Sequence, residues 1–111
     1  MGILKYSETK AEVLSDRIER RLIHLTNIMT VVIDLKKGPW NEPLPHHHHI
    51  HEQTTYIAHG EIMFFMEGED PVHLKQGDMF YVSESKKHTV QLLSDTARLI
   101  DSFNPIRKDF L

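Results

Sequence analysis

Apolar and polar residues alternate with a period of two through the middle of the chain. The clearest example is residues 29–36, where one set of alternate positions is apolar: Met29, Val31, Ile33 and Leu35. This is the period of a β-strand with one buried face. The pattern therefore predicts a strand here, which ends at the Lys37-Gly38-Pro39 turn.

Further strands are predicted at intervals of roughly eight to twelve residues, with turn-forming residues between them. They cover residues 45–59, 61–66, 71–74, 79–82, 88–93 and 96–101. Residues 1–18 are mostly polar, with a weak signal for a short helix over 7–12 capped by Ser7. Short strands at this spacing, without a long helix, are typical of an antiparallel sandwich or barrel, so the predicted fold class is all-β.

Composition narrows the kind of protein. The 111 residues suffice for one domain, and 40% hydrophobic with 26% charged residues is ordinary for a globular chain. A net charge of −3 gives no electrostatic basis for binding nucleic acid or an anionic membrane. The absence of cysteine excludes disulfides and thiolate zinc sites. No signal-peptide pattern and no apolar run of about 20 residues is present, so the expected location is the cytoplasm.

Histidine is concentrated in one short stretch, since five of the nine histidines lie within residues 46–51. On a strand, alternate side chains share a face, so His47 and His49 can face one metal ion. Gln53 lies four residues after His49, so a bend in the chain between them could bring its side chain to the same ion as a third ligand. Imidazole nitrogens suit Zn, Cu, Fe and Ni, and an amide oxygen adds a neutral ligand. The stretch therefore predicts a metal site on a strand.

Two simpler explanations of the histidines are a purification tag and a solvated histidine-rich loop. A tag is usually an unbroken run at a chain end. This run is internal, is interrupted by Ile50 and leads into a strand-like segment, so the surrounding pattern favours a metal site.

Two motifs, in this order, resemble those of the cupin family. The first motif is matched by two histidines, an amide and a glycine: His47, His49, Gln53 and Gly60. The second is matched by a glycine, a short strand and a histidine: Gly77, residues 79–82 and His88. The match to these motifs is looser at three points. The loop from Gly38 to His47 is longer than in the usual pattern. His46 and His48 satisfy a looser form of the first motif, although the downstream spacing favours His47 and His49. The usual Pro-x-Gly turn of the second motif is replaced by Ser83-Glu84-Ser85.

The resemblance implies a double-stranded β-helix barrel, or jelly roll, with a short N-terminal extension. The barrel would span residues about 28–103 of a single domain over 1–111, followed by a tail over 104–111. The resemblance also implies one divalent metal ion per chain inside the barrel. Its ligands would be His47, His49, Gln53 and, as the fourth, His88.

The C-terminal residues look like those of the small pectin-degradation cupins of the KdgF type, which open unsaturated uronate sugars. Asp101, Phe103 and Arg107 match active-site positions of that family. The resemblance implies that Asp101 transfers a proton, Arg107 binds the substrate carboxylate and Phe103 packs against the sugar. Without this resemblance, Asp101 would be read as a solvated charge at the end of a strand and Phe103 as a core residue. Arg107 would be read as a surface arginine that pairs with Asp109 or Glu69.

The implied function is metal-dependent ring opening of 4,5-unsaturated monouronates from pectin or alginate. Three neutral imidazoles and an amide leave the ion its full charge, which favours a Lewis acid over a redox centre. Zn, Ni, Mn and Fe(II) all suit this set. The alternatives are another metal-dependent cupin enzyme, such as a dioxygenase, lyase or cyclase, and a non-catalytic cupin that binds a small molecule. A homodimer is also expected, with the strands before Gly38 as its contact.

Overall fold

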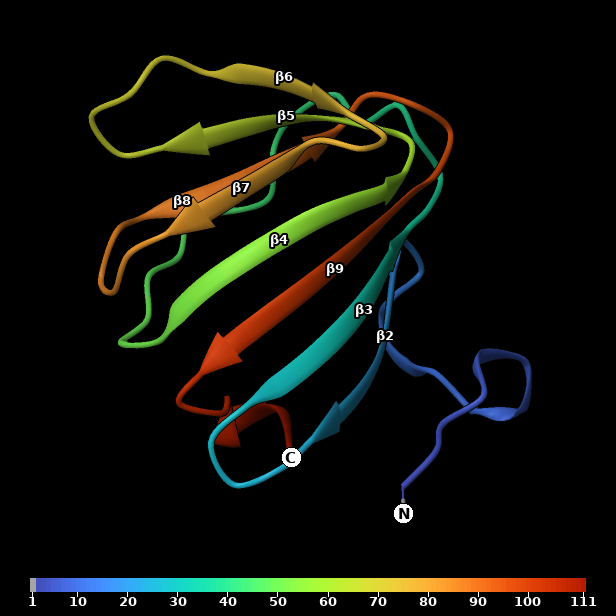
Figure 1. Cartoon of the computed structure of the whole chain (residues 1–111). Coiled ribbons are helices and arrows are strands. Elements are labelled where there is room, and N and C mark those ends of the chain that lie inside the picture. Colours follow the sequence, from blue (N-terminus) through green and yellow to red (C-terminus); the bar gives the residue numbers. More distant parts are fainter. Residues whose placement is uncertain (1) are drawn as a thin grey trace.

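The computed structural model describes residues 2–111, which form two antiparallel β-sheets and two short 3-10 helices (Figure 1). One sheet has six strands in the order β1-β2-β3-β9-β4-β7, and the other has three in the order β6-β5-β8. The elements are, in chain order, η1 (Tyr6–Glu8), β1 (Glu12–Ser15), β2 (Ile18–His24), β3 (Met29–Leu35), β4 (Glu52–His59), β5 (Glu61–Met66), β6 (Val72–Lys75), β7 (Met79–Val82), β8 (His88–Leu92), β9 (Ala97–Asn104) and η2 (Lys108–Phe110). In this described part of the chain, neither helix has the length or hydrophobicity to cross a membrane.

The period-two pattern correctly predicted most of the strands. β3 occupies the predicted position, and its alternate residues Met29 and Val31 are fully buried. The turn between β4 and β5 is also where it was predicted. Gly60 has a φ of +86° there, and a Cβ at this position would overlap the carbonyl oxygen of Thr96, so the turn requires glycine.

The N-terminal segment differs from its prediction. The helix predicted over 7–12 is wrong, because only Tyr6–Glu8 form a 3-10 turn and β1 begins at Glu12. Tertiary contacts override the weak local helix signal. The Tyr6 hydroxyl donates to Asp34 Oδ2 at 2.8 Å, and the guanidinium of Arg21 lies 4.0 Å from the Tyr6 ring centroid. These contacts hold the segment on the outer face of the large sheet.

The histidine strand predicted over 45–59 is wrong in its first half, because β4 begins only at Glu52. The preceding segment runs irregularly along β8. The Leu44 N–H donates to the Val90 carbonyl at 3.1 Å, and His47 and His88 exchange two backbone hydrogen bonds of 3.0 and 2.9 Å. A physical reason for the irregular path is Pro43 and Pro45, which have no N–H to offer to a ladder.

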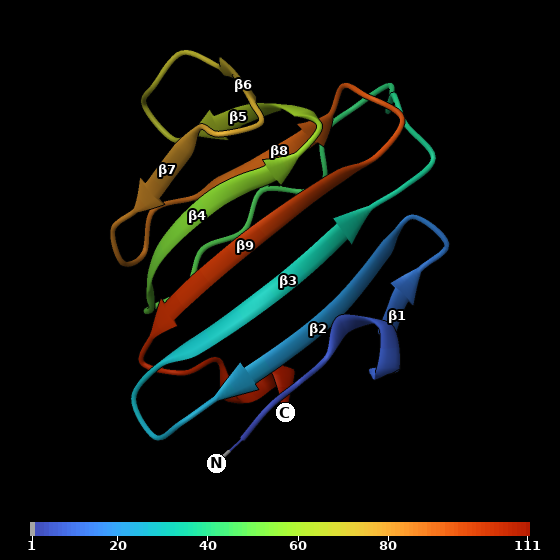
Figure 2. The same ribbon diagram turned by 45° about the vertical axis from the view of Figure 1, so that its right-hand side comes forward.

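The two sheets pack face to face, and their inner faces bury two apolar clusters. Phe64 of β5 stacks on Phe80 of β7 with ring centroids 4.1 Å apart. The larger cluster contains Leu35, Trp40, Ile57, Ile62, Leu92, Ala97 and Leu99. The smaller contains Met29, Val31 and Phe103, with Phe110 of the C-terminal tail (residues 105–111) packed against it. After β9 this tail turns back toward β2 (Figure 2).

Candidate metal centre and its cavity

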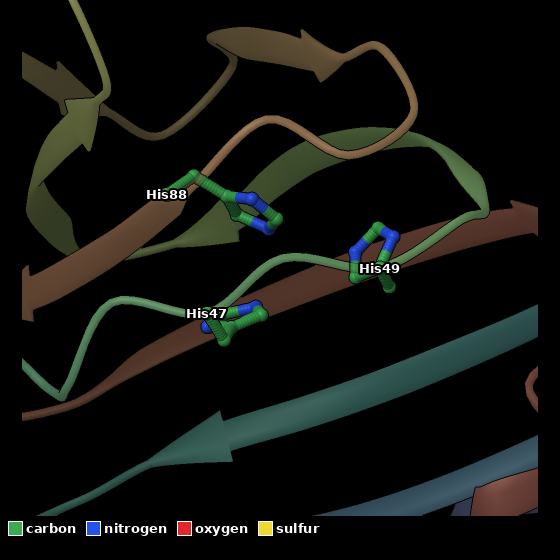
Figure 3. A group of neighbouring side chains, drawn as sticks. All are labelled: His47, His49 and His88. Carbon is green, nitrogen blue, oxygen red and sulfur yellow. The ribbon is translucent and has the colours of Figure 1, made fainter.

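Three histidines from two parts of the chain converge on one point (Figure 3). His47 and His49 come from the irregular segment, and His88 is the first residue of β8. One ring nitrogen of each lies within 4.8 Å of the others, which is close enough for a single ion to contact all three. His46 and His48, the alternative pair, lie outside this group, although they share their exposure with His47.

Backbone carbonyls fix the proton positions on two of these rings. His49 Nδ1 lies 2.9 Å from the His51 carbonyl oxygen, and His88 Nδ1 lies 2.9 Å from that of Lys86. A carbonyl oxygen only accepts hydrogen bonds, so each Nδ1 carries the proton and each Nε2 keeps its lone pair. Among the described residues, His88 Nε2 is buried and has no hydrogen-bond partner. This is the arrangement expected of a histidine that ligates a metal through Nε2.

Gln53 is the candidate oxygen donor of the same centre. Its Oε1 lies 3.1 Å from His49 Nε2, while its Nε2 donates to Thr55 Oγ1 at 2.9 Å. With the proton of His49 on Nδ1, two lone-pair atoms face each other. A cation between them removes this repulsion. The donor set, three imidazoles and one amide oxygen, is thus compatible with a divalent metal ion.

The surroundings of the three imidazoles favour their neutral form, although only His49 and His88 are buried and His47 is partly exposed to solvent. Desolvation lowers the pKa of His47 to about 4, with further lowering from the neighbouring His88 and His49. Burial also lowers the pKa of His49 and of His88. Because only neutral imidazole binds a metal, this environment favours the ligating form at neutral pH.

Asp101 lies beside this centre on the inner face of the large sheet. Its strand, β9, lies between β3 and β4, and its cross-strand neighbour on β4 is Thr55. Asp101 Oδ1 accepts hydrogen bonds from Thr55 Oγ1 at 2.6 Å and from Gln53 Nε2 at 3.4 Å. The residue is only 4% exposed. Burial raises the pKa of Asp101 to about 6, although these hydrogen bonds and the charge of Arg107 act in the opposite direction.

Phe103, on β9, contacts the histidine cluster, and Arg107, in the C-terminal tail, contacts Phe103. The ring of Phe103 meets His49 edge-on at 5.7 Å, and the Arg107 guanidinium carbon lies 5.3 Å from the Phe103 centroid. Arg107 Nε and Nη2 donate to the two carboxylate oxygens of Asp109 at 3.0 and 2.8 Å, which lowers the pKa of Asp109. Arg107 therefore forms the ion pair with Asp109 and not the one with Glu69. Its side chain also borders a cavity.

One cavity of about 270 Å³ between the sheets brings most of these groups together. Its polar lining residues are Arg20, His47, Gln53, His88, Thr89, Asp101 and Arg107. The rest of the wall is apolar and includes Leu35, Leu99, Phe80, Phe103 and Phe110. His49 is not a lining residue but contacts Gln53 directly. The candidate ligands and the candidate proton-transfer and carboxylate-binding groups therefore meet at a single cavity.

Comparison with known protein families decides which family these features represent. The family described as Cupin domain matches residues 31–103 of this chain. The chain belongs to the cupin family. The prediction of an all-β double-stranded β-helix, or jelly roll, is thereby confirmed.

Relatives of this cupin include small proteins of nearly the same length. The "Pectin degradation protein KdgF" of Dickeya dadantii is 38% identical over 105 residues, 94% of this chain and 93% of that protein. The structure of KdgF from Halomonas sp. superposes with a TM-score of 0.89 at 26% identity, covering 99% of this chain and all of that one. An RmlC-like cupin from Shewanella frigidimarina gives a TM-score of 0.88 at 28% identity, covering 100% and 96% of the two chains.

Three residues of the cupin's site region are not indicated by the sequence motifs. Thr55 follows Gln53 at a spacing of two, so the strand period alone would have placed both on the same face. Arg20 lies on the inner face of β2 and borders the cavity, but β2 itself was not predicted. Phe110 packs against both Arg20 and Arg107, a contact with no local sequence signal.

Proposed function

We propose that this cupin is a metal-dependent enzyme that opens the ring of 4,5-unsaturated monouronates, the sugars released when pectin or alginate is degraded. The observation that carries the proposal is the meeting of three kinds of group at one cavity. These are a neutral three-histidine and amide ligand set, a buried carboxyl group and an arginine. The 38% identity to a protein named for pectin degradation supports the substrate class.

The dimensions of the cavity favour a single sugar over a polymer. Pockets for drug-sized ligands usually measure about 300–1,000 Å³, and this cavity, at about 270 Å³, is smaller. It lies between the two sheets and is partly open to solvent. A monouronate therefore suits the space better than an oligosaccharide.

Arg107 is assigned to the carboxylate of the sugar. Asp109 occupies Nε and Nη2 of its guanidinium, which holds the plane and leaves Nη1 and the outer hydrogen of Nη2 for a second carboxylate. Phe103, beside the guanidinium, would pack against the sugar and exclude water. The two side chains would thereby orient the ring with respect to Asp101.

Asp101 is assigned to proton transfer. Ring opening breaks the bond between C1 and the ring oxygen and converts the C1 hydroxyl into an aldehyde, with no gain or loss of atoms. The hydroxyl proton must leave, and a proton must reach the ring oxygen or C4. Both hydrogen bonds to Asp101 described above are accepted by Oδ1, so Oδ2 is assigned to the moving proton. A pKa of about 6 lets the group both accept and return a proton near neutral pH.

His47, His49, Gln53 and His88 would hold the ion, one per chain. A divalent ion there would supply a Lewis acid that polarises substrate oxygens. Because all four donors are neutral, the whole positive charge of the ion remains available to the substrate. Zn, Ni, Mn and Fe(II) are the candidates, and metal analysis of the purified protein distinguishes them.

Ultraviolet absorbance tests the activity, because linearisation removes the conjugated double bond of the sugar. Wild type should accelerate the loss of absorbance above the spontaneous rate. Asp101→Asn should abolish this acceleration with substrate binding retained. Arg107→Ala should reduce it by about tenfold or more, and Arg107→Lys should also be impaired because it lacks the planar fork.

Lys108→Ala is the matched control for Arg107, since Lys108 is an exposed neighbour in the same tail that does not border the cavity. It should behave as wild type. Substrate binding without any acceleration in wild type would identify a binding protein instead. Equal rates in wild type, Asp101→Asn and Arg107→Ala would contradict the assigned residues.

A further inference from the structure

The C-terminal tail is held against the cavity by a contact with β2. Arg20 faces inward, as expected from its pairing with Ile33 on the neighbouring strand β3, and it is 8% exposed. Its guanidinium carbon lies 3.8 Å from the ring centroid of Phe110, in the tail. Both residues border the cavity. A buried arginine of the N-terminal hairpin thus supports the last aromatic residue of the chain.

Glu12 fixes the orientation of the Arg20 guanidinium. The two residues are cross-strand partners on β1 and β2, and Arg20 Nε and Nη2 donate to the Glu12 oxygens at 3.2 and 2.8 Å. A guanidinium held at two nitrogens presents a fixed flat face on which an aromatic ring can stack. The Glu12 carboxylate also balances the charge of Arg20. Arg20 is therefore better suited to support a ring than to bind an anion itself.

Phe110 connects this support to Arg107. The guanidinium carbon of Arg107 lies 4.3 Å from the Phe110 centroid, and the Phe110 N–H donates to the Arg107 carbonyl at 2.9 Å. Phe110 also meets Phe103 edge-on at 5.8 Å. Movement of Phe110 would therefore displace both the side chain and the backbone of Arg107.

We propose that Arg20 is a positioning residue for Arg107, acting through Phe110. It docks the tail against β2 and thereby sets the place at which the anionic end of a ligand is bound. The identity of that ligand, a sugar carboxylate, rests on the proposed function. The docking of the tail does not.

Kinetics of Arg20→Met and Arg20→Lys test the positioning role. Both variants should raise KM for the unsaturated monouronate by about tenfold, with kcat changed by less than about threefold and metal content unchanged, because a displaced Arg107 weakens carboxylate binding in the ground state and the transition state alike. Arg20→Lys keeps the charge beside Glu12 and loses the flat face together with the paired hydrogen bonds that fix it, so it remains informative where the methionine variant does not fold.

Arg17→Met is the matched control. Arg17 lies in the turn between β1 and β2, and its guanidinium also covers an aromatic ring, that of Trp40 at 4.8 Å. It does not border the cavity, so its loss should leave KM unchanged. An equal rise of KM in Arg17→Met would show that general loosening of the hairpin, and not Arg20, is responsible.

Coupling to Phe110 provides the decisive comparison. In a Phe110→Ala background, Arg20→Met should have no further effect on KM, because its intermediary is absent. Independent, additive effects of the two substitutions would overturn the proposal.

Hydrogen exchange measured on tail peptides adds a test that needs no substrate. Amides of residues 107–111 should exchange faster in Arg20→Met than in wild type or Arg17→Met. Unchanged exchange would overturn the docking role even with an altered KM. If wild type lacks turnover but tail exchange responds to Arg20 as expected, the proposed function fails and the docking role of Arg20 stands.

Discussion

Burial of Asp101 suits its proposed role in proton transfer but lowers the stability of the folded protein. Burial raises its pKa from 3.8 to about 6, so its ionised form disfavours the folded state. The unfolded chain ionises first as pH rises. The resulting loss of stability is absent below about pH 4, increases up to about pH 6 and is constant above it. It amounts to about 3 kcal/mol at most.

Asp101→Asn should therefore stabilise the metal-free protein in a pH-dependent manner. The variant keeps the side-chain shape and an oxygen for Thr55, but it carries no charge. Its free energy of unfolding should exceed that of wild type at pH 7, by up to about 3 kcal/mol, and match it near pH 4. Denaturant titrations at several pH values measure this, with the exposed Asp70→Asn as control. A gain of equal size at both pH values would contradict an electrostatic origin.

Ser85 adopts a backbone conformation that usually favours glycine. It has a φ of 64°, and its N–H donates to the His49 carbonyl at 2.6 Å. This residue thus supports the backbone of a candidate ligand, at the place where the cupin motif usually has a Pro-x-Gly turn. Serine can make the turn, but the left-handed region costs a residue with a Cβ about 1–2 kcal/mol.

Ser85→Gly should accordingly raise the free energy of unfolding, by about 0.5–1 kcal/mol after the entropy of glycine is subtracted. Metal content should not change, because the hydrogen bond comes from the backbone. Ser83→Gly is the control, since Ser83 lies in the same loop outside the left-handed region and should lose stability. Thermal or denaturant unfolding of both variants checks the difference in sign.

At the scale of elements, sequence pattern predicted strands well where one face is apolar. β2 was missed because its inward residue Arg20 is charged and its partner Glu12 lies in another strand. The path of His47 was missed because it depends on backbone bonds to His88, which is distant in sequence. The alternation of apolar and polar residues therefore predicted which face of a strand is buried, but it could not reveal contacts between segments that are distant in sequence.

The candidate ligands come from three segments, the irregular stretch before β4, β4 itself and β8, which makes their roles separable. His88→Ala should lose most of the bound metal, because His88 is the ligand that comes from β8. His46→Ala should retain it, since His46 is exposed in the same segment as His47 but outside the cluster. Elemental analysis of the purified variants, normalised to protein, measures this. A fully loaded His88→Ala with an empty His46→Ala would reverse the assignment of ligands.

At the scale of the whole molecule, the N-terminal strands continue the sheet that carries the site. β2 pairs along β3, and β3 pairs along β9, which bears Asp101 and Phe103. The tail then returns to β2 through Phe110. This continuity agrees with one domain over residues 1–111, which remains a prediction.

The same N-terminal region leaves a large apolar surface exposed. Ile3 and Leu4 border a groove together with Ile23, Leu25 and Ile28, which lie in or beside β2 and the turn to β3. Leu25 is 74% exposed. Contiguous exposed apolar residues are typical of protein interfaces, and symmetric pairs are the commonest oligomers. The surface therefore supports the expectation of a homodimer that pairs through its N-terminal strands.

We predict that light scattering at micromolar concentration will give twice the mass of one 13.0 kDa chain. Leu25→Glu should shift the protein to the mass of one chain, because it places a charge in the proposed interface. Tyr81→Glu is the control on a different part of the surface, where the side chain of Tyr81 is 76% exposed, and it should leave the mass unchanged. A wild-type mass near 13.0 kDa would contradict the dimer. Dissociation by Tyr81→Glu, with Leu25→Glu still paired, would move the interface to the outer face of β7.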